Sequence, residues 1–284
     1  MDALRLVENA LKTAEIPAPY VFHQEARGDT AFSCKVAAKG LNLFAKCHKN
    51  ADILMSEADG LSALSAYVRV PHVEFVGEIE GYGVLLMEWL PMRRPANEIE
   101  WCSLADHLTG LHVHSCQEGR FGFPADNYIG GSVQRNRVCH SWRQFFVEQR
   151  LAPQLGMAKA LPAKVKRDIE RVMGGVEAWL PEQPCSALLH GDFWSGNLGL
   201  HAGEPIFYDP ACYYGDPQVD LAMMALFGHV PDCFYHAYQG ALPDSGQRSA
   251  WRVYDLYHLL NHFNLFGAGY AGDVARVTEQ ILRH

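Results

Sequence analysis

Hydrophobic spacing in the first ninety residues changes from helical to alternating and back. Residues 2–14 carry apolar side chains on one helical face. Apolar and polar positions then alternate on both sides of the Lys39-Gly40 turn, within a strand-rich segment at 20–48, which predicts a hairpin. Helical spacing returns at 52–65, and the apolar run Val84–Met87 predicts a buried strand.

Helical spacing dominates after Pro91. The predicted helices lie at 99–115, 137–155, 164–180, 219–228, 249–268 and 273–283. A loop rich in glycine, asparagine and aromatic residues separates the first two, and residues 186–215 return to strand and loop. We therefore expect an α+β fold of two lobes: a small N-terminal antiparallel sheet with one helix at 1–90, and a larger, mainly helical lobe at 91–284. The crevice between two such lobes is a common ligand site.

Charge and polarity exclude some classes of protein. The chain has 284 residues and a formal net charge of −8. An acidic surface repels nucleic-acid phosphates, so no nucleic-acid partner is expected. The longest charge-free apolar stretch, Leu256–Gly272, contains histidines and asparagines that would be unsatisfied in lipid. Charged residues at Asp2, Arg5 and Glu8 oppose a signal peptide, so we predict a cytoplasmic protein without membrane association.

The cysteine spacing offers no metal or redox motif. The two cysteines that lie closest in sequence, Cys34 and Cys47, are 13 residues apart. That separation is too wide for a zinc knuckle or a Cys-x-x-Cys pair. We predict reduced, mostly buried thiols at all eight positions, which are 34, 47, 102, 116, 139, 185, 212 and 233.

The segment His190–Asn197 carries the strongest chemical signal. Asp192 and Asn197 have the Asp-x-x-x-x-Asn spacing of a kinase catalytic loop, and Asp209 ends the next apolar strand. An isolated pair at this spacing often only decorates a turn, but the preceding His-Gly and the second aspartate favour chemistry. In phosphoryl transfer a carboxylate orients the acceptor hydroxyl and hard oxygen ligands hold magnesium. We predict Asp192 as the catalytic base, and Asn197 and Asp209 as magnesium ligands.

Two segments of the N-terminal lobe predict a nucleotide site. Lys46 ends an apolar strand, and Glu57 lies on the helix that follows. In kinases such a lysine contacts the α- and β-phosphates of ATP, and a helical glutamate holds it. Glu88, Trp89 and Leu90 fall where the connection between the lobes is expected, and an extended backbone there would offer hydrogen bonds to adenine.

These segments resemble the fructosamine kinase (ketosamine 3-kinase) family, within the wider aminoglycoside- and choline-phosphotransferase group. His190–Asn197 is similar to the family's catalytic signature, including the Trp194-Ser195 insert that more distant relatives usually lack. Asp216-Pro217-Gln218 is closer to the bacterial branch. The resemblance covers nearly the whole chain, and its other segments are Phe44–Lys46, Glu57–Leu61, Glu88–Leu90, Phe121–Phe123, Asn127–Gly130, Gln134, Asn136, Trp142, Phe145-Phe146, Arg150-Leu151, Asp209–Asp216 and Asp220–Gly228.

The resemblance implies a protein-kinase-like fold and a phosphotransferase that uses ATP and Mg²⁺. The family phosphorylates the 3-hydroxyl of fructosamines, ribulosamines or related ketoamines, and the phosphorylated adduct then breaks down and frees the amine. The expected partner is therefore a small-molecule or protein-bound ketosamine, and we expect a monomer or weak homodimer. Candidate acceptor contacts are the aromatic Trp194, Tyr213 and Tyr214 and the acidic Asp216.

Other activities stay open at this point. The segment Arg27–Phe32 has a single glycine, Gly28, where the family's nucleotide loop usually carries paired glycines that let the backbone approach phosphates. That departure motivates a nucleotide-binding pseudokinase, which the complete set of charged site residues opposes. An aminoglycoside- or choline-type phosphotransferase is the other alternative, and the Trp194-Ser195 insert and the Tyr213–Gly215 segment oppose it.

Two further polar features have weaker interpretations. His112 and His114 flank one residue, but no third metal ligand is spaced to join them, so helix-end or surface histidines are expected. Asp220 lies at a predicted helix start, and we expect it to brace the catalytic loop rather than to contact substrate.

Overall fold

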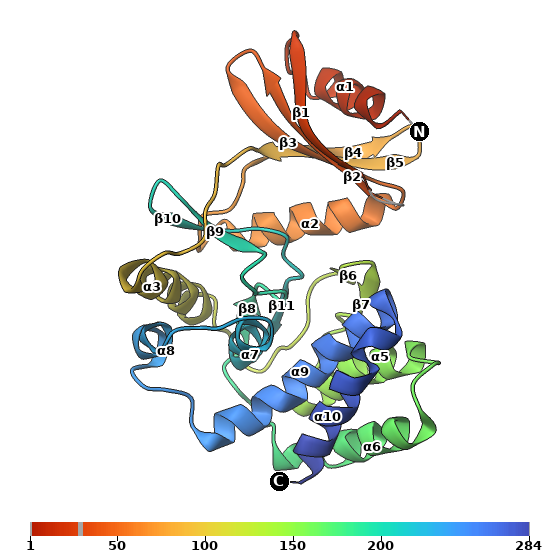
Figure 1. Cartoon of the computed structure of the whole chain (residues 1–284), viewed down its shortest axis with the longest axis vertical. Helices are drawn as coiled ribbons and strands as arrows, with labels where there is room; N and C mark the ends of the chain where they lie inside the picture. The colour runs from red at the N-terminus through yellow and green to blue at the C-terminus, as the bar shows by residue number, and fades with distance from the viewer. Residues whose placement is uncertain (1, 28–30, 284) are drawn as a thin grey trace.

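The computed structural model describes residues 2–27 and 31–283. A five-stranded sheet with two helices forms the N-terminal part of the chain, and the remainder is mainly helical (Figure 1). The predicted α+β fold class is therefore confirmed, with two helices beside the sheet rather than one. Gly28, Asp29 and Thr30 of the predicted nucleotide loop lie outside the described residues.

The N-terminal sheet is antiparallel throughout, in the order β1-β2-β3-β5-β4. Its strands are β1 (Tyr20–Arg27), β2 (Ala31–Ala38), β3 (Leu41–His48), β4 (Val73–Ile79) and β5 (Tyr82–Glu88). The predicted hairpin is confirmed as β2 and β3, and its turn includes Gly40 at a φ of +88°. Glycine adopts that left-handed conformation without strain.

Helices α1 (Ala3–Thr13) and α2 (Ala51–Leu64) cover opposite faces of this sheet (Figure 1). Successive side chains of a strand point to opposite faces. Leu86 of β5 accordingly packs in the core that contains α1, whereas the adjacent Leu85 packs in the core that contains α2. The predicted helices at 2–14 and 52–65 are confirmed, with ends that differ by one residue.

The C-terminal part contains eight α-helices among the described residues. They are α3 (Glu98–His114), α4 (Trp142–Phe145), α5 (Ala152–Met157), α6 (Ala163–Gly174), α7 (Gln218–Leu226), α8 (Asp232–Gln239), α9 (Ser245–Phe266) and α10 (Ala271–Leu282). A π-helix, Phe146–Leu151, joins α4 to α5, and 3-10 turns lie at Val176–Ala178 and Ala268–Tyr270. None of these helices, nor any other in the described residues, combines the length and hydropathy needed to cross a membrane.

Three short antiparallel strand pairs lie between the helices of this part. They are β6 (Asn127–Ile129) with β7 (Ser132–Gln134), β8 (Ala187–Leu189) with β11 (Tyr213–Gly215), and β9 (Leu198–His201) with β10 (Glu204–Phe207). The first pair lies in a segment that the sequence indicated only as a loop. Helix α8 was not predicted, and the helix expected from 137 begins at Trp142.

Helix α2 connects the sheet to the C-terminal part. Its buried Leu54, Leu61 and Leu64 belong to the larger hydrophobic core, which is built mainly from C-terminal helices. A Cβ added at Gly60 would lie 2.9 Å from Pro210, so α2 meets the segment after β10 at close range. The position of α2 is therefore set by both parts of the chain.

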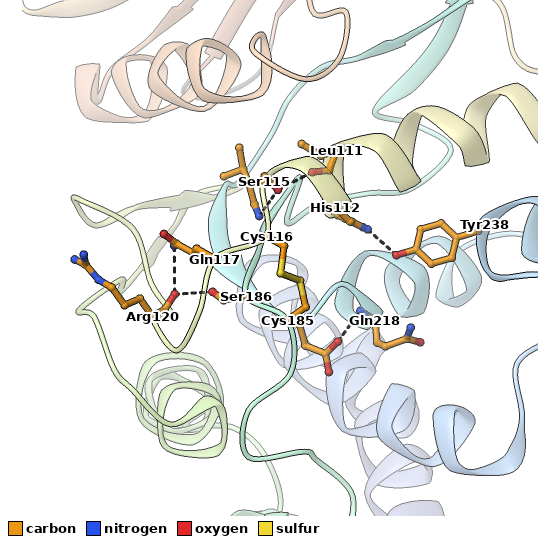
Figure 2. Close-up of a disulfide and its surroundings, with 12 residues drawn as sticks. Leu111, His112, Ser115, Cys116, Gln117, Arg120, Cys185, Ser186, Gln218 and Tyr238 are labelled. Atoms are coloured by element: carbon orange, nitrogen blue, oxygen red, sulfur yellow. Dashed lines mark hydrogen bonds between the residues drawn. A yellow bond between two sulfur atoms is a disulfide. The ribbon is translucent and has the colours of Figure 1, made fainter.

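The prediction that all eight cysteines are reduced is wrong for one pair. Cys116 and Cys185 form a disulfide that joins the residue after the α3 C-cap to the segment before β8 (Figure 2). The two cysteines are 69 residues apart in sequence, so no local spacing motif could predict the bridge. Free thiols remain at Cys47, Cys102, Cys139, Cys212 and Cys233, and the cytoplasmic location stays a prediction.

We expect the Cys116→Ser/Cys185→Ser double variant to have a lower free energy of unfolding than the oxidised protein. The bridge closes a loop of 69 residues, and restricting the unfolded chain in this way stabilises a fold by roughly 4 kcal/mol. Denaturant unfolding with and without dithiothreitol measures the effect. Cys233→Ser, at a free and partly exposed cysteine, is the control. Equal midpoints for wild type and the double variant in oxidising buffer would contradict the bridge.

Candidate active site

Asp220 of α7 binds the backbone immediately before Asp192 through its side chain. The fully buried Asp220 carboxylate accepts hydrogen bonds from the N–H groups of His190 and Gly191, both at 2.9 Å. The predicted bracing role of Asp220 is confirmed by these contacts. His112 of α3 approaches the same carboxylate with Nε2 at 3.1 Å. Both His112 and His114 lie in the last turn of α3, as expected, and His114 is exposed. His112 is only 2% exposed, so a surface position is wrong for this residue alone.

Gly191 allows the catalytic segment to pack directly on the segment that follows Asp209. Its φ is +80°, and a Cβ at this position would lie 2.0 Å from the carbonyl oxygen of Ala211. Ala211 in turn donates its N–H to the carbonyl of His190 at 2.8 Å. Only glycine satisfies both the conformation and the clearance. The two segments that carry Asp192 and Asp209 are thus fixed backbone to backbone.

Asp192 and Asn197 face each other across the catalytic loop. Asn197 donates from Nδ2 to Oδ2 of Asp192 at 2.8 Å and to the Asp192 carbonyl at 3.0 Å. Burial raises the pKa of Asp192 to about 7; the hydrogen bond from Asn197 opposes that shift, and the charge of Asp209 adds to it. The amide therefore fixes the orientation of a carboxyl group that can accept a proton near neutral pH.

Lys46 of β3 lies between Glu57 and Asp209. Its Nζ donates to Oε1 of Glu57 at 2.7 Å and also to Oδ1 of Asp209. Burial opposes the charge of Lys46, but the two carboxylates outweigh it and raise the pKa of Lys46. Burial likewise raises the pKa of Glu57 against the pull of Lys46. For Asp209 the Lys46 ammonium prevails over burial and lowers the pKa.

Asp209 has an unusual backbone conformation. It follows β10 with a φ of +55°, in the left-handed region that residues other than glycine seldom adopt. The N–H of the preceding Tyr208 is bonded to the Asn197 carbonyl at 3.0 Å, which joins this segment to the catalytic loop. Strain of this kind is retained where the surroundings impose it, and it concentrates at functional sites.

Two neighbouring cavities, which share lining residues, open onto these side chains. The smaller, of about 250 Å³, contains Asp192, Trp194, Asn197 and Asp209 in its lining. The larger, of about 660 Å³, has a mostly apolar lining. Both include Lys46 and Glu57, so the charged cluster lies where the cavities meet. A groove of about 480 Å³ along the C-terminal half of α2 contains none of these residues, and we do not connect it with the chemistry.

The connection after β5 is less directly related to these cavities. Glu88 pairs with Arg69, and its carboxylate also accepts from the His72 N–H at 3.3 Å. Trp89 donates its N–H to the Asn42 carbonyl at 2.9 Å and packs its ring against Phe44. Neither of the two cavities includes Glu88, Trp89 or the buried Leu90. Their role in adenine binding therefore stays a prediction.

Trp194 is the candidate acceptor contact that reaches the cavity. Its ring lies edge-on to Phe227, with centroids 6.4 Å apart. The ring of Phe227 in turn packs against that of His262, with centroids 4.6 Å apart. His262 packs against Tyr270, with centroids 5.2 Å apart. The sequence did not single out His262 or Tyr270, because this cluster forms only where α7 and α9 meet the catalytic loop.

Tyr213 and Asp216 do not reach the cavity, and their prediction as acceptor contacts is corrected. Tyr213 is fully buried beneath the guanidinium of Arg150, whose Cζ lies 3.8 Å from the ring centroid. Asp216 is 4% exposed and accepts from the Tyr254 hydroxyl at 2.7 Å. Tyr214 is partly exposed but lines neither cavity. The strand alternation of β11 explains why adjacent tyrosines differ in burial.

The β6–β7 hairpin contributes residues to which the sequence analysis gave no role. Tyr128 and Gly130 line the small cavity, and Tyr128 accepts a hydrogen bond from Asn50, the N-cap of α2, at 3.1 Å. Ile53 of α2 completes this wall. The Asn127–Gly130 motif belonged to the family resemblance, but its position beside the site follows only from the tertiary structure.

Known proteins are similar to this chain over most of its length. Residues 13–284 match the family model described as fructosamine kinase. A probable ketoamine kinase of Synechocystis sp. is 40% identical over 241 residues, which cover 81% of this chain and 79% of the relative. One of Enterococcus faecium is 36% identical over 263 residues, with 89% and 92% covered.

Solved structures agree on the fold. A crystal structure described as a putative fructosamine-3-kinase of Thermobifida fusca has a TM-score of 0.83 at 28% identity, covering 97% of this chain and 98% of that one. An aminoglycoside phosphotransferase solved with AMP-PNP and hygromycin B has a TM-score of 0.70 at 14% identity, with 96% and 97% covered, and shows the kinase-like fold alone. With the family match over residues 13–284, these findings show that the chain is a phosphotransferase and belongs to the fructosamine kinase family.

Proposed function

We propose that this protein transfers the terminal phosphoryl group of ATP to a sugar hydroxyl of a ketosamine, with Mg²⁺ as the metal ion. The observation that carries the proposal is the grouping of Asp192, Asn197, Asp209 and Lys46 around one cavity. Family membership supports the ketosamine class of acceptor. Residues 1–90 would form the nucleotide-binding lobe, and residues 91–284 the catalytic and acceptor-binding lobe.

Asp192 acts as the base in this proposal. The acceptor hydroxyl donates to its free carboxylate oxygen, because Asn197 occupies the other one. As the hydroxyl oxygen bonds to the terminal phosphorus, the bond to the ADP leaving group breaks and the hydroxyl proton passes to Asp192. The transition state of such a transfer is loose, so the main contribution of Asp192 is to orient the hydroxyl.

Asn197 and Asp209 fit a magnesium ion that is shared with a nucleotide. No group of three or more His, Cys, Asp or Glu side chains among residues 2–27 and 31–283 is spaced to hold a metal alone. Magnesium typically takes one or two protein ligands and completes its shell with water and phosphate oxygens. Asn197 uses Nδ2 on Asp192, which leaves Oδ1 as a ligand atom. A bound magnesium ion would neutralise charge on the triphosphate.

Lys46 supplies the positive charge for the α- and β-phosphates. Glu57 accepts a hydrogen bond from Lys46, which keeps the ammonium directed at the cavity. This arrangement is the lysine–glutamate pair of kinases. It supports catalysis rather than a pseudokinase, because the pair, the base and both metal ligands are present together.

Trp194 provides an aromatic face for the acceptor. A ketosamine has a carbohydrate C–H surface and a cationic amine, and an aromatic ring attracts both. Phosphorylation at the 3-hydroxyl would destabilise the sugar–amine adduct and free the amine. The acceptor could be a small molecule or a protein-bound adduct, since the larger cavity opens beside the reaction site.

We expect Asp192→Asn to abolish phosphorylation while nucleotide binding is retained. The amide preserves shape but cannot take the hydroxyl proton, and losing a positioned base costs roughly a hundredfold or more in kcat. Steady-state turnover and AMP-PNP titration measure the two properties. Asp168→Asn, on the surface of α6, is the matched control. Near-normal turnover of Asp192→Asn would remove this residue from the role.

We expect Asp209→Ala and Asn197→Ala each to weaken magnesium-dependent nucleotide binding and turnover. Each substitution removes one hard oxygen ligand. Magnesium titrations at fixed nucleotide concentration measure the change, with Asp273→Ala on the surface of α10 as control. The metal assignment is wrong if both variants reproduce the wild-type titration.

We expect phosphorylation of synthetic ribulosamine or fructosamine, and none of kanamycin or choline. A desolvated cation against an aromatic face gains about 0.5–2 kcal/mol, which Trp194 can supply to the ketosamine amine. Production of ADP and mass spectrometry of the acceptor decide the question. Activity confined to kanamycin or choline would favour the alternative phosphotransferase, and nucleotide binding without any acceptor activity would favour the pseudokinase.

A further inference from the structure

The least expected charge in the core is that of Arg150. This arginine is fully buried in the π-helix Phe146–Leu151, a type of irregular turn that often occurs near functional sites. Its guanidinium donates to the carbonyl oxygens of Arg135 and Gln149 and to Oδ1 of Asn136, the last at 2.7 Å. All three acceptors are neutral. A buried cation with only neutral partners is costly, so its retention calls for a reason beyond stability.

The aromatic surroundings of Arg150 hold its plane in one orientation. The guanidinium carbon lies 3.8 Å from the ring centroid of Tyr213, 4.6 Å from that of Phe145 and 5.8 Å from that of Tyr257. A planar guanidinium can stack on rings and donate in its own plane at the same time, which a lysine ammonium cannot do. Arg150 thereby fixes the position of Asn136.

Asn136 begins a chain of buried amides that leads toward the metal-binding segment. Its Nδ2 donates to Oδ1 of Asn127 at 2.9 Å, and Asn127 donates to the carbonyl of Cys212 at 2.7 Å. Gln134 donates to the same Asn127 oxygen at 2.9 Å and to the carbonyl of Ala211 at 3.0 Å. Tyr257 completes the set by donating to Oε1 of Gln134 at 2.7 Å. We call Asn127, Gln134 and Asn136 the amide cluster.

The amide cluster donates hydrogen bonds to the carbonyl groups of Ala211 and Cys212, which follow Asp209 and Pro210 in the chain. Ala211 is held by Gln134 through its carbonyl and by the His190 carbonyl through its N–H. Its carbonyl also occupies the space that a side chain at Gly191 would need. The segment after Asp209 is therefore clamped between the amide cluster and the catalytic loop, which fixes the strained backbone of Asp209 itself.

The two faces of the β6–β7 hairpin contact different parts of the site. Asn127 and Gln134 are register partners and are buried, at 5% and 2% exposure, and both contact the segment after Asp209. The intervening Tyr128 lines the cavity and contacts the N-cap of α2. None of the amide cluster lines either of the two cavities. The hydrogen bonds of these side chains therefore reach the small cavity through the segment that carries Asp209.

We propose that Arg150 and the amide cluster are positioning residues for the metal-binding carboxylate Asp209. The inference rests on the proposed function, because it assigns Asp209 to a metal ion. Residues that orient a metal ligand commonly change metal affinity or activity by about 10- to 100-fold when substituted. A role confined to stability would lower the melting temperature and leave metal affinity unchanged.

Gln134→Met tests the proposal in the full-length protein. Methionine keeps the volume but removes both donors to Asn127 and Ala211. The matched control is Gln154→Met, because Gln154 has the same 2% exposure and also loses amide hydrogen bonds, to Asn261 and Asn264. Neither partner of Gln154 contacts the segment after Asp209 in the described structure.

The measurement is calorimetric titration of AMP-PNP at increasing Mn²⁺ or Mg²⁺, with no turnover required, together with melting temperature. We expect about 10- to 100-fold weaker metal-dependent binding in Gln134→Met and wild-type affinity in Gln154→Met, at comparable losses of melting temperature. Equal metal affinities in the two variants would overturn the proposal. If Gln134→Met does not fold, Asn127→Ala removes the contact to Cys212 and is judged by the same criterion.

Failure of the proposed function has a different signature. If wild-type protein shows no metal-dependent nucleotide binding, the proposed function falls and this inference falls with it. If wild type binds and Gln134→Met binds equally well, only the positioning role is overturned. Arg150→Lys is a second test, because lysine retains the positive charge but lacks the planar guanidinium. We expect weaker metal-dependent binding in this variant, and full retention of affinity would oppose the role of Arg150.

Discussion

The pairing of Lys46 with two carboxylates is the interaction on which the geometry of the site depends. Lys46 belongs to the sheet, Glu57 to α2 and Asp209 to the segment after β10, so one ammonium group joins three elements. A charge removed from water is destabilising unless it is paired and hydrogen-bonded. Displacing any of the three elements would break at least one of these two ion pairs. The relative position of sheet, α2 and catalytic segment is therefore fixed by electrostatics as well as by packing.

Polar side chains are buried around this pairing at specific points. Asp220 with His112 holds the backbone before Asp192, and the amide cluster with Arg150 holds the backbone after Asp209. Buried polar groups stabilise a unique arrangement only when all of them are satisfied. Here Asp220, Asn127 and Gln134 bond directly to backbone N–H or carbonyl groups of these segments. His112 and Arg150 act on them through Asp220 and Asn136, and Nε of Arg150 has no hydrogen-bond partner among the described residues. The core thus constrains the catalytic backbone through directional hydrogen bonds, which apolar packing could not supply.

The sequence predicted the parts of this site that depend on local spacing. Asp192, Asn197 and Asp209 follow from one short motif and the strand after it, and the helices at α1 and α2 follow from periodicity. It could not distinguish Tyr213 from Tyr214, because the alternation of a three-residue strand assigns faces only once its partner is known. The Cys116–Cys185 bridge, the contact of His112 with Asp220 and helix α8 were not predicted for a related reason. Each depends on contacts between segments far apart in the chain.

Asp192 and Asp209 both line the small cavity but differ in their environments, and this difference is consistent with the separate roles that we propose for them. Burial raises the pKa of Asp192 to about 7, because its side-chain partner is the neutral amide of Asn197. Burial acts on Asp209 as well, but the Lys46 ammonium outweighs it and lowers the pKa of that carboxyl group. Asp209 therefore stays ionised at neutral pH, as a ligand for a cation requires, while Asp192 can gain or lose a proton. Environments that separate the pKa values of two neighbouring acids are a recurrent way to obtain both functions in one site. In this protein the separation follows from which partner each aspartate contacts, a cation for one and an amide for the other.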